Sequence, residues 1–219
     1  MPSVRLFEIG RNAWRGFSRW PAGRTALYLA GDGRASVDEC SGRLLDAAPA
    51  DAGVDCLVHD PWRPAPSVGG AFGNPPGPAD RSAIDARGDV VTFTTPPFAQ
   101  ELRLAGESAV ELWLHCDRPS FDLCSTLSRI TRSGQVLTLT QGYRHVAART
   151  ALDRALGVPM RATCAAIAPG EALRLSIAAA CFPAYPVNPA PGAIQPMRRW
   201  TRRRSPRSAS ATAASVRHS

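Results

Sequence analysis

Strict alternation of apolar and polar residues dominates the chain from residue 90 onward, and this two-residue period is typical of half-buried β-strands. Between residues 110 and 116 every second position is apolar, while Glu111, Trp113 and His115 lie at the positions between. Residues 173 to 177 repeat the pattern after Pro169-Gly170. Because successive strand side chains point to opposite faces, the alternation predicts the following core residues: Leu112, Leu114, Leu173, Leu175 and Ile177.

Turn residues divide the pattern into short strands. A hairpin turn is predicted at Gly106-Glu107-Ser108, and a second hairpin loop at Arg132-Ser133-Gly134. Further strands are expected at residues 4 to 9, 26 to 30 and 54 to 59. About ten short strands separated by Gly and Pro indicate an all-β fold, an antiparallel β-sandwich or jelly roll.

Two stretches lack the strand pattern. Residues 147 to 156 are good helix formers followed by Gly157 and Pro159, so a helix of about two turns is expected there. Residues 61 to 78 are rich in Pro and Gly, which predicts a long irregular loop.

The net charge of +8 is concentrated at one end of the chain. Residues 198 to 219 hold seven Arg and no acid, so residues 1 to 197 are close to neutral. This Arg/Ser/Ala-rich tail has too few apolar residues to bury a core and is expected to be disordered. Nucleic acid is therefore an unlikely partner, reached only through the tail.

Cysteine usage and hydropathy bear on the compartment. The six Cys show no zinc-ligand spacing, and we expect free, mostly buried thiols in a reducing environment. The N-terminal residues lack the apolar run of a secretory signal, and nothing approaches the ~18 consecutive apolar residues of a membrane span. A cytoplasmic protein with no membrane association is the expectation.

Four stretches of the chain carry a family resemblance. They are residues 66 to 70 (PSVGG), residues 80 to 97 (DRSAIDARGDVVTFTTPP), residues 169 to 177 (PGEALRLSI) and residues 182 to 189 (FPAYPVNP). Together they resemble the C-terminal domain of Xaa-Pro dipeptidyl-peptidases and of the cocaine-esterase-like (CocE/NonD) serine hydrolases. The fourth stretch departs from the family pattern in having Cys181 where Asn is usual.

The resemblance implies a division into three parts. Residues 25–197 are expected to form a jelly roll of the galactose-binding-like type. Residues 1–24 resemble the end of an α/β-hydrolase domain and are expected to be a remnant of it, a short orphaned strand that is poorly anchored. Its apolar side chains would form an exposed patch: Val4, Leu6, Phe7, Ile9 and Trp14. Residues 198–219 form the disordered basic tail.

Catalytic residues are not predicted anywhere in the chain. A serine hydrolase of this type needs its nucleophile in a Gly-x-Ser-x-Gly elbow, and that motif does not occur in the sequence. A triad of a Ser with His145 and Asp122 is conceivable in space but not favoured, because neither residue has an obvious partner nearby in sequence. The other candidate bases and acids lie at ordinary strand or loop positions: His59, His115, Glu101 and Glu111. We predict no catalytic, cofactor-binding or metal-binding residue, and no cofactor.

The leading functional hypothesis is a non-catalytic C-terminal accessory domain of a CocE/NonD-type serine hydrolase. The resemblance implies ester and amide hydrolysis or dipeptidyl-peptidase activity for the parent family. The catalytic Ser/Asp/His domain is expected to be absent from this chain and to be its partner, encoded upstream or as a separate chain. The chain alone is predicted to be inactive, and a homo-oligomer is left open. The alternative is a free-standing β-sandwich module that binds a ligand or carbohydrate.

Overall fold

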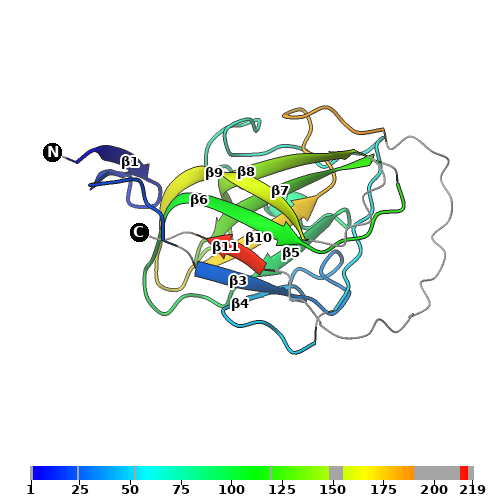
Figure 1. Cartoon of the computed structure of the whole chain (residues 1–219), viewed down its shortest axis with the longest axis horizontal. Coiled ribbons are helices and arrows are strands. Elements are labelled where there is room, and N and C mark those ends of the chain that lie inside the picture. Colours follow the sequence, from blue (N-terminus) through cyan, green and yellow to red (C-terminus); the bar gives the residue numbers. More distant parts are fainter. Residues whose placement is uncertain are drawn as a thin grey trace.

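The structure is a computed structural model that describes residues 2–23, 25–51, 53–118, 120–147, 155–189 and 213–216. Nearly all of its regular structure is β-strand (Figure 1). Two strands, β1 (Val4–Glu8) and β2 (Ala13–Phe17), form a small sheet of their own. The helix α1 (Ser82–Asp85) is a single turn, and within the described ranges no helix has the length and apolarity needed to span a bilayer. The main sheet contains β3 (Thr25–Ala30), β4 (Arg43–Leu45), β5 (Val90–Thr94), β6 (Leu102–Leu112), β7 (Ser120–Ile130), β8 (Val136–Ala147), β9 (Leu156–Ile167), β10 (Ala172–Ala178) and β11 (Ala213–Val216).

The main sheet closes on itself in the order β10-β5-β4-β3-β11-β6-β9-β8-β7, with β7 pairing back to β10. Two of the strand–strand contacts in this closed sheet consist of a single residue pair each. Arg43 with Thr94 joins β4 to β5, and Gly142 with Met160 joins β8 to β9. The closed sheet is therefore built as two layers, β4-β3-β11-β6-β9 and β8-β7-β10-β5, which pack face to face. The predicted antiparallel β-sandwich is confirmed.

The hydrophobic core lies between the two layers. Of the five predicted core residues, Leu112, Leu173, Leu175 and Ile177 are buried. The fifth, Leu114, lies just beyond the end of β6 and packs half-buried against the core. The intervening residues of this stretch, from Glu111 to His115, are exposed as the alternation requires.

The outer face of β10 is also buried, which the alternation did not predict. Arg174 and Ser176 are only 7% and 1% exposed. The Arg174 guanidinium donates to a Glu39 carboxylate oxygen at 2.6 Å and lies 3.9 Å from Asp85. Asp85 in turn accepts a 2.8 Å hydrogen bond from Arg81. The loop that contains Glu39 and the helix α1 therefore cover the outer face of β10 and are held to it by ion pairs. We call this loop and helix the covering layer.

One predicted hairpin is confirmed and the other is wrong. The loop at residues 132 to 134 joins β7 to β8, with Gly134 at φ +85°. At Gly106, by contrast, β6 continues straight through, and the register with β9 shifts there. Gly106 has φ +103°, and a Cβ on it would lie 2.8 Å from the Pro21 carbonyl oxygen. The glycine therefore serves a close backbone approach at a bulge rather than a turn.

Two further predictions differ from the structure or lie outside it. Residues 54 to 59 do not form a strand, because their alternation has no partner strand to pair with. The predicted helix falls mostly on residues 148–154, which lie outside the described residues, while Ala147 ends β8 and Leu156 begins β9.

The predicted disorder of the basic tail is wrong at Ala213–Val216. These residues form β11, which pairs with both β3 and β6. The composition argument considered only side-chain burial, whereas the backbone groups of two neighbouring strands supply partners for any residue type. The rest of the tail, residues 198–212 and 217–219, lies outside the described residues.

Candidate functional site

The β1–β2 hairpin projects from one end of the sandwich (Figure 1). Its turn uses Gly10 at φ +94° and Asn12 at φ +52°, a conformation that these two residue types tolerate best. Phe7 and Trp14 are cross-strand partners whose rings meet edge to face at 5.7 Å. Their side chains remain 47% and 64% exposed. An exposed aromatic pair on a projecting element is typical of an interaction surface.

The predicted apolar patch is only partly exposed, and the expectation of poor anchoring is wrong. Ile9 donates its backbone N–H to the Cys164 carbonyl at 2.9 Å and accepts from the Ala166 N–H at 2.8 Å. Its side chain packs half-buried against the main core. A Cβ on Gly10 would lie 2.5 Å from the Ala166 carbonyl oxygen, so the chain approaches β9 closely here. The hairpin is therefore fixed to the sandwich at its turn.

Ion pairs reinforce this attachment. Glu8 is buried and accepts from Arg15 at 3.3 Å, with Arg103 of β6 at 3.9 Å. On the surface, Arg11 makes a two-pronged contact with Glu101 at 2.8 and 2.9 Å. The hydrogen bond from Arg11, followed by that from Arg103, lowers the pKa of Glu101. Glu101, considered in the sequence as a catalytic acid, thus belongs to the hairpin's attachment.

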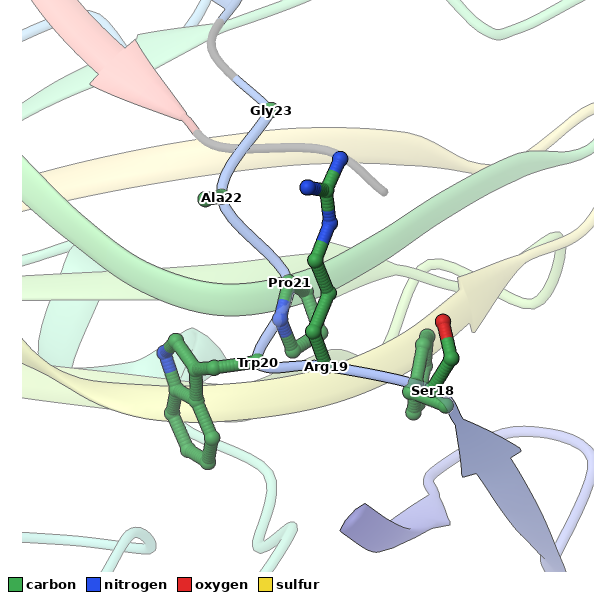
Figure 2. Close-up of a pocket in the computed structure, with 7 residues that line it drawn as sticks. Ser18, Arg19, Trp20, Pro21, Ala22 and Gly23 are labelled. Carbon is green, nitrogen blue, oxygen red and sulfur yellow. The ribbon is translucent and has the colours of Figure 1, made fainter. Parts of the chain in front are cut away.

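The segment that follows β2 lines an open hollow (Figure 2), formed by residues 17 to 23. Pro21 is buried against β6, while Arg19 and Trp20 extend from the backbone in different directions. Arg19 is the one ionisable side chain of this lining. A hollow with a lone guanidinium has no acid–base pair for proton transfer, so it continues the hairpin surface rather than forming a catalytic pocket.

A second cluster lies on the outer face of β7 and β8. Asp122 and His145 are cross-strand partners, and the His145 Nδ1 lies 2.6 Å from the Asp122 carboxylate. The side chain of Asp122 is 3% exposed, whereas that of His145 is 52% exposed. A carboxylate bound to Nδ1 orients an imidazole and leaves its Nε2 directed outward.

Residue Asn188, in the segment after β10, holds this pair against the sheet. Its side-chain amide donates to Asp122 and to the Ser120 hydroxyl, each at 3.4 Å. The backbone carbonyl oxygen of Asn188 lies 3.1 Å from the Nε2 of His59. His59, a candidate base in the sequence, therefore connects its loop to the segment at residues 182–189, which contains Asn188.

The cluster contains two of the three members of a catalytic triad. The structure brings Asp122 and His145 together, which the sequence treated as unlikely. In the part of the chain that the structure describes, however, no hydroxyl or thiol is hydrogen-bonded to His145. Within the described residues the pair therefore lacks the adjacent nucleophile that a covalent intermediate requires.

Aromatic rings from three segments cover the same face. Tyr143 and Tyr185 stack at 3.9 Å with an interplanar angle of 5°. Phe72 meets Tyr185 edge-on at 6.3 Å, and the Arg161 guanidinium lies 4.3 Å above the Phe72 ring. Because the two tyrosines stack on one another and a guanidinium lies over Phe72, this cluster fixes loops to the sheet, while Phe72 remains 50% exposed.

Titration of Tyr143 provides a test of the cluster. Burial, followed by the charge of Asp122, raises the pKa of Tyr143 to about 12, compared with about 10 in an unfolded chain. Between these pH values the unfolded state loses the proton first, so stability should fall as the pH rises from about 10 to 12. Urea unfolding of the wild type and of Tyr143→Phe over this range should show that the variant lacks this part of the decline. Equal decline in both proteins, or phenolate absorbance from Tyr143 near pH 10, would contradict the assignment.

Comparison with protein families gives one match along most of the chain. The model of the X-Pro dipeptidyl-peptidase C-terminal non-catalytic domain matches residues 1–199. Cocaine esterase of Rhodococcus sp. (strain MB1 Bresler) is 27% identical over 210 residues, which cover 89% of this chain and 37% of that protein.

Solved structures give the same picture at lower identity. An aminopeptidase from a marine sediment Thaumarchaeota archaeon has a TM-score of 0.71 at 20% identity, and an α-amino acid ester hydrolase has 0.72 at 19%. A CocE/NonD family hydrolase from Staphylococcus aureus has 0.57 at 13%. Each covers the whole of this chain, which spans 38% or 39% of the other protein. At these identities the likeness shows the fold.

Proposed function

The chain belongs to the family of the X-Pro dipeptidyl-peptidase C-terminal non-catalytic domain, and we propose that it packs as an accessory domain against the α/β-hydrolase catalytic domain of a CocE/NonD-type serine hydrolase. The catalytic domain would supply the Ser, Asp and His of the reaction, whether it is joined to this chain or separate. The share of the relatives that this chain spans, 37% to 39%, supports a partner of larger size. The hydrolysed bond would be an ester or an amide, as in the parent family.

The observation that carries the proposal is the exposed aromatic pair Phe7 and Trp14 on a hairpin that is fixed at its turn. A rigid element with exposed aromatic side chains loses little conformational entropy when it binds, which favours stable association. We assign residues 1–24 to the junction with the catalytic domain and residues 25–197 to the accessory domain itself. The function of the sandwich is then to shape and support the partner, with no turnover of its own.

A chimera tests this assignment. The C-terminal part of Rhodococcus cocaine esterase that matches this chain would be replaced by residues 1–219, and hydrolysis of a p-nitrophenyl ester measured. We expect an active chimera, no turnover by the chain alone, and a loss of about tenfold or more in recovered activity for the double variant Phe7→Ser/Trp14→Ser, because buried aromatic side chains dominate interface energies.

The matched control for the chimera is Trp62→Ser. Trp62 is 92% exposed and lies in the loop at residues 61 to 78, outside the β1–β2 hairpin in the sequence. The control should retain full activity. A chimera as sensitive to Trp62→Ser as to the double variant, or insensitive to both, would show that the hairpin is not the contact.

A free-standing binding module is the alternative function. It would need an accessible aromatic platform or a polar groove. In the Phe72–Tyr185–Tyr143 cluster the two tyrosine rings stack on each other, and Phe72, 50% exposed, carries the Arg161 guanidinium over its ring. No described feature favours this alternative over the accessory role.

A further inference from the structure

The segment at residues 53–60 has the side-chain pattern of a β-strand but no neighbouring strand. The chain runs through it without a turn, a bend or a bridge to another segment. The side chains of Val54, Cys56 and Val58 are exposed, and the residues between them are half-buried. A period of two in exposure is the geometry of a strand that lies on a surface. The alternation in the sequence is therefore realised here in the side chains, and what is missing is a second strand.

Contacts of the half-buried residues hold this segment in place. Asp55 accepts a 2.9 Å hydrogen bond from the backbone N–H of Ala35. Leu57 packs against the main core, and the Nε2 of His59 lies 3.1 Å from the backbone carbonyl oxygen of Asn188. A strand that pairs with this segment would not have to order it first, which lowers the entropic cost of binding.

The backbone of the segment is available for pairing. Among the described residues, no hydrogen bond is made to a backbone N–H or C=O group of residues 54–59. An unpaired strand edge is a template for another strand, and proteins protect such edges with charged side chains, Pro or bulges. The exposed row here has no charge, and Val54 and Val58 are 79% and 54% exposed. The edge is therefore unprotected.

We propose that residues 54–59 form an interface between two copies of this chain, paired antiparallel about a twofold axis through Cys56. In such a symmetric pair one residue faces itself, and that residue defines the register. With Cys56 on the axis, Val54 of each copy faces Val58 of the other. All three exposed apolar side chains then meet apolar side chains. This interface is separate from the proposed contact with a catalytic domain and does not depend on it.

The two neighbouring registers fit less well. An axis through Asp55 would place two carboxylates directly opposite each other, and like charges that face each other destabilise a strand pair. An axis through Leu57 would place Val54 opposite the carboxylate of Asp60. The register through Cys56 avoids both contacts and matches the exposed row with itself.

The interface is small, and this sets its strength. One pair of short strands buries less surface than the roughly 1,200 Å² at which stable protein interfaces begin. Association should therefore be weak, reversible and dependent on concentration. A weak contact is best detected by a readout that is specific to its position.

A cross-link at Cys56 provides this readout. Facing residues of an antiparallel pair have Cα atoms about 4.5 to 5.5 Å apart, within the roughly 4.4 to 6.8 Å that a disulfide spans. The reduced wild-type chain would be oxidised with copper phenanthroline, which accepts the two electrons that two thiols release, and mapped by mass spectrometry. We expect Cys56–Cys56 as the main link between chains. Cys40 is the internal control, because it is also exposed and random collision would link it as often as Cys56.

Two charge variants test the pairing in solution. In Val54→Lys/Val58→Lys each facing pair brings two ammonium groups together, whereas in Val54→Glu/Val58→Lys each brings a carboxylate opposite an ammonium group. Both variants change the same exposed positions, so both should keep the fold. Both would also carry Phe7→Ser/Trp14→Ser, which removes association through the hairpin. Sedimentation velocity should show dimerisation about tenfold or more weaker for the first variant than for the second.

Equal dimerisation of the two charge variants, or links at Cys40 as frequent as those at Cys56, would overturn the proposal. So would a wild-type chain that forms no Cys56 link at any concentration. If that chain forms no link, but Val54→Lys/Val58→Lys lowers the activity of the chimera with cocaine esterase, the catalytic domain covers this edge in place of a second copy. The cross-linking result uses the wild-type chain and does not depend on whether a variant folds.

Discussion

Replacing Asp85 by alanine is expected to destabilise the domain by about 3 to 5 kcal/mol, because the change leaves buried positive charge without its partner. The Asp85 side chain is fully buried and that of Arg81 is 6% exposed, with a 2.8 Å hydrogen bond between them. The side chain of Arg174, which is 8% exposed, lies 3.9 Å from the same carboxylate. Urea unfolding should show the loss as a lower midpoint with an unchanged slope.

The matched control for Asp85→Ala is Asp38→Ala. Asp38 pairs with Arg34 at the same four-residue spacing, but the two side chains are 40% and 65% exposed. Exposed pairs contribute about 1 kcal/mol or less, so this variant should unfold almost as the wild type does. Equal losses in the two variants would mean that the buried ion pairs do not stabilise the covering layer.

The alternation in the sequence predicted the sandwich because one face of each long strand meets the core. The same alternation gave the wrong exposure for polar residues on the outer face of β10. It predicted solvent around Arg174 and Ser176, although loops and α1 bury both. Residues 54 to 59 alternate without forming a strand. A two-residue period records which side chains are apolar, and does not record which loops fold back to cover the polar ones or which strand is available to pair.

The Asp122–His145 pair shows why the candidate site could not be read from the sequence. A regular hairpin through the loop at residues 132 to 134 keeps the register in which Ile130 faces Val136 and Ser128 faces Thr138. That register would place Arg144 opposite Asp122 and turn His145 to the other face. A bulge between Leu127 and Ser128 shifts the pairing by one residue and brings His145 opposite Asp122. One inserted residue reverses every later side chain on a strand, and no local signal marks its place.

For the N-terminal segment, the expectation drawn from the family resemblance differs from the structure. Resemblance to the end of a hydrolase domain implied an orphaned strand, whereas the structure has a hairpin attached through Ile9 and Glu8. The attachment depends on β9 and β6, more than 90 residues away in the sequence, and contacts of that separation leave no local pattern. Phe7 and Trp14 are exposed as predicted, although that prediction came from the resemblance to a hydrolase strand without its sheet and not from a pattern within the strand.

Deleting residues 2–22 is therefore expected to destabilise the sandwich, in contrast to the harmless deletion that a poorly anchored remnant implies. The two backbone hydrogen bonds of Ile9 contribute about 1 kcal/mol each, and partial burial of its side chain contributes about 1 kcal/mol more. The deletion also uncovers β6 at Gly106, where Pro21 now lies. The Tm should fall by about 5 to 15 °C in differential scanning calorimetry.

The double variant Phe7→Ser/Trp14→Ser in the intact chain separates the exposed face of the hairpin from its attachment. It removes the 47% and 64% exposed rings but keeps the Ile9 contacts with β9, so it should reduce concentration-dependent association while leaving the Tm within about 2 °C of the wild type. A deletion that melts with the wild type would show that the contacts of Ile9 and Glu8 add no stability. A double variant that melts with the deletion would place the stabilising contacts on the aromatic face, and the hairpin would then belong to the fold rather than to an interface.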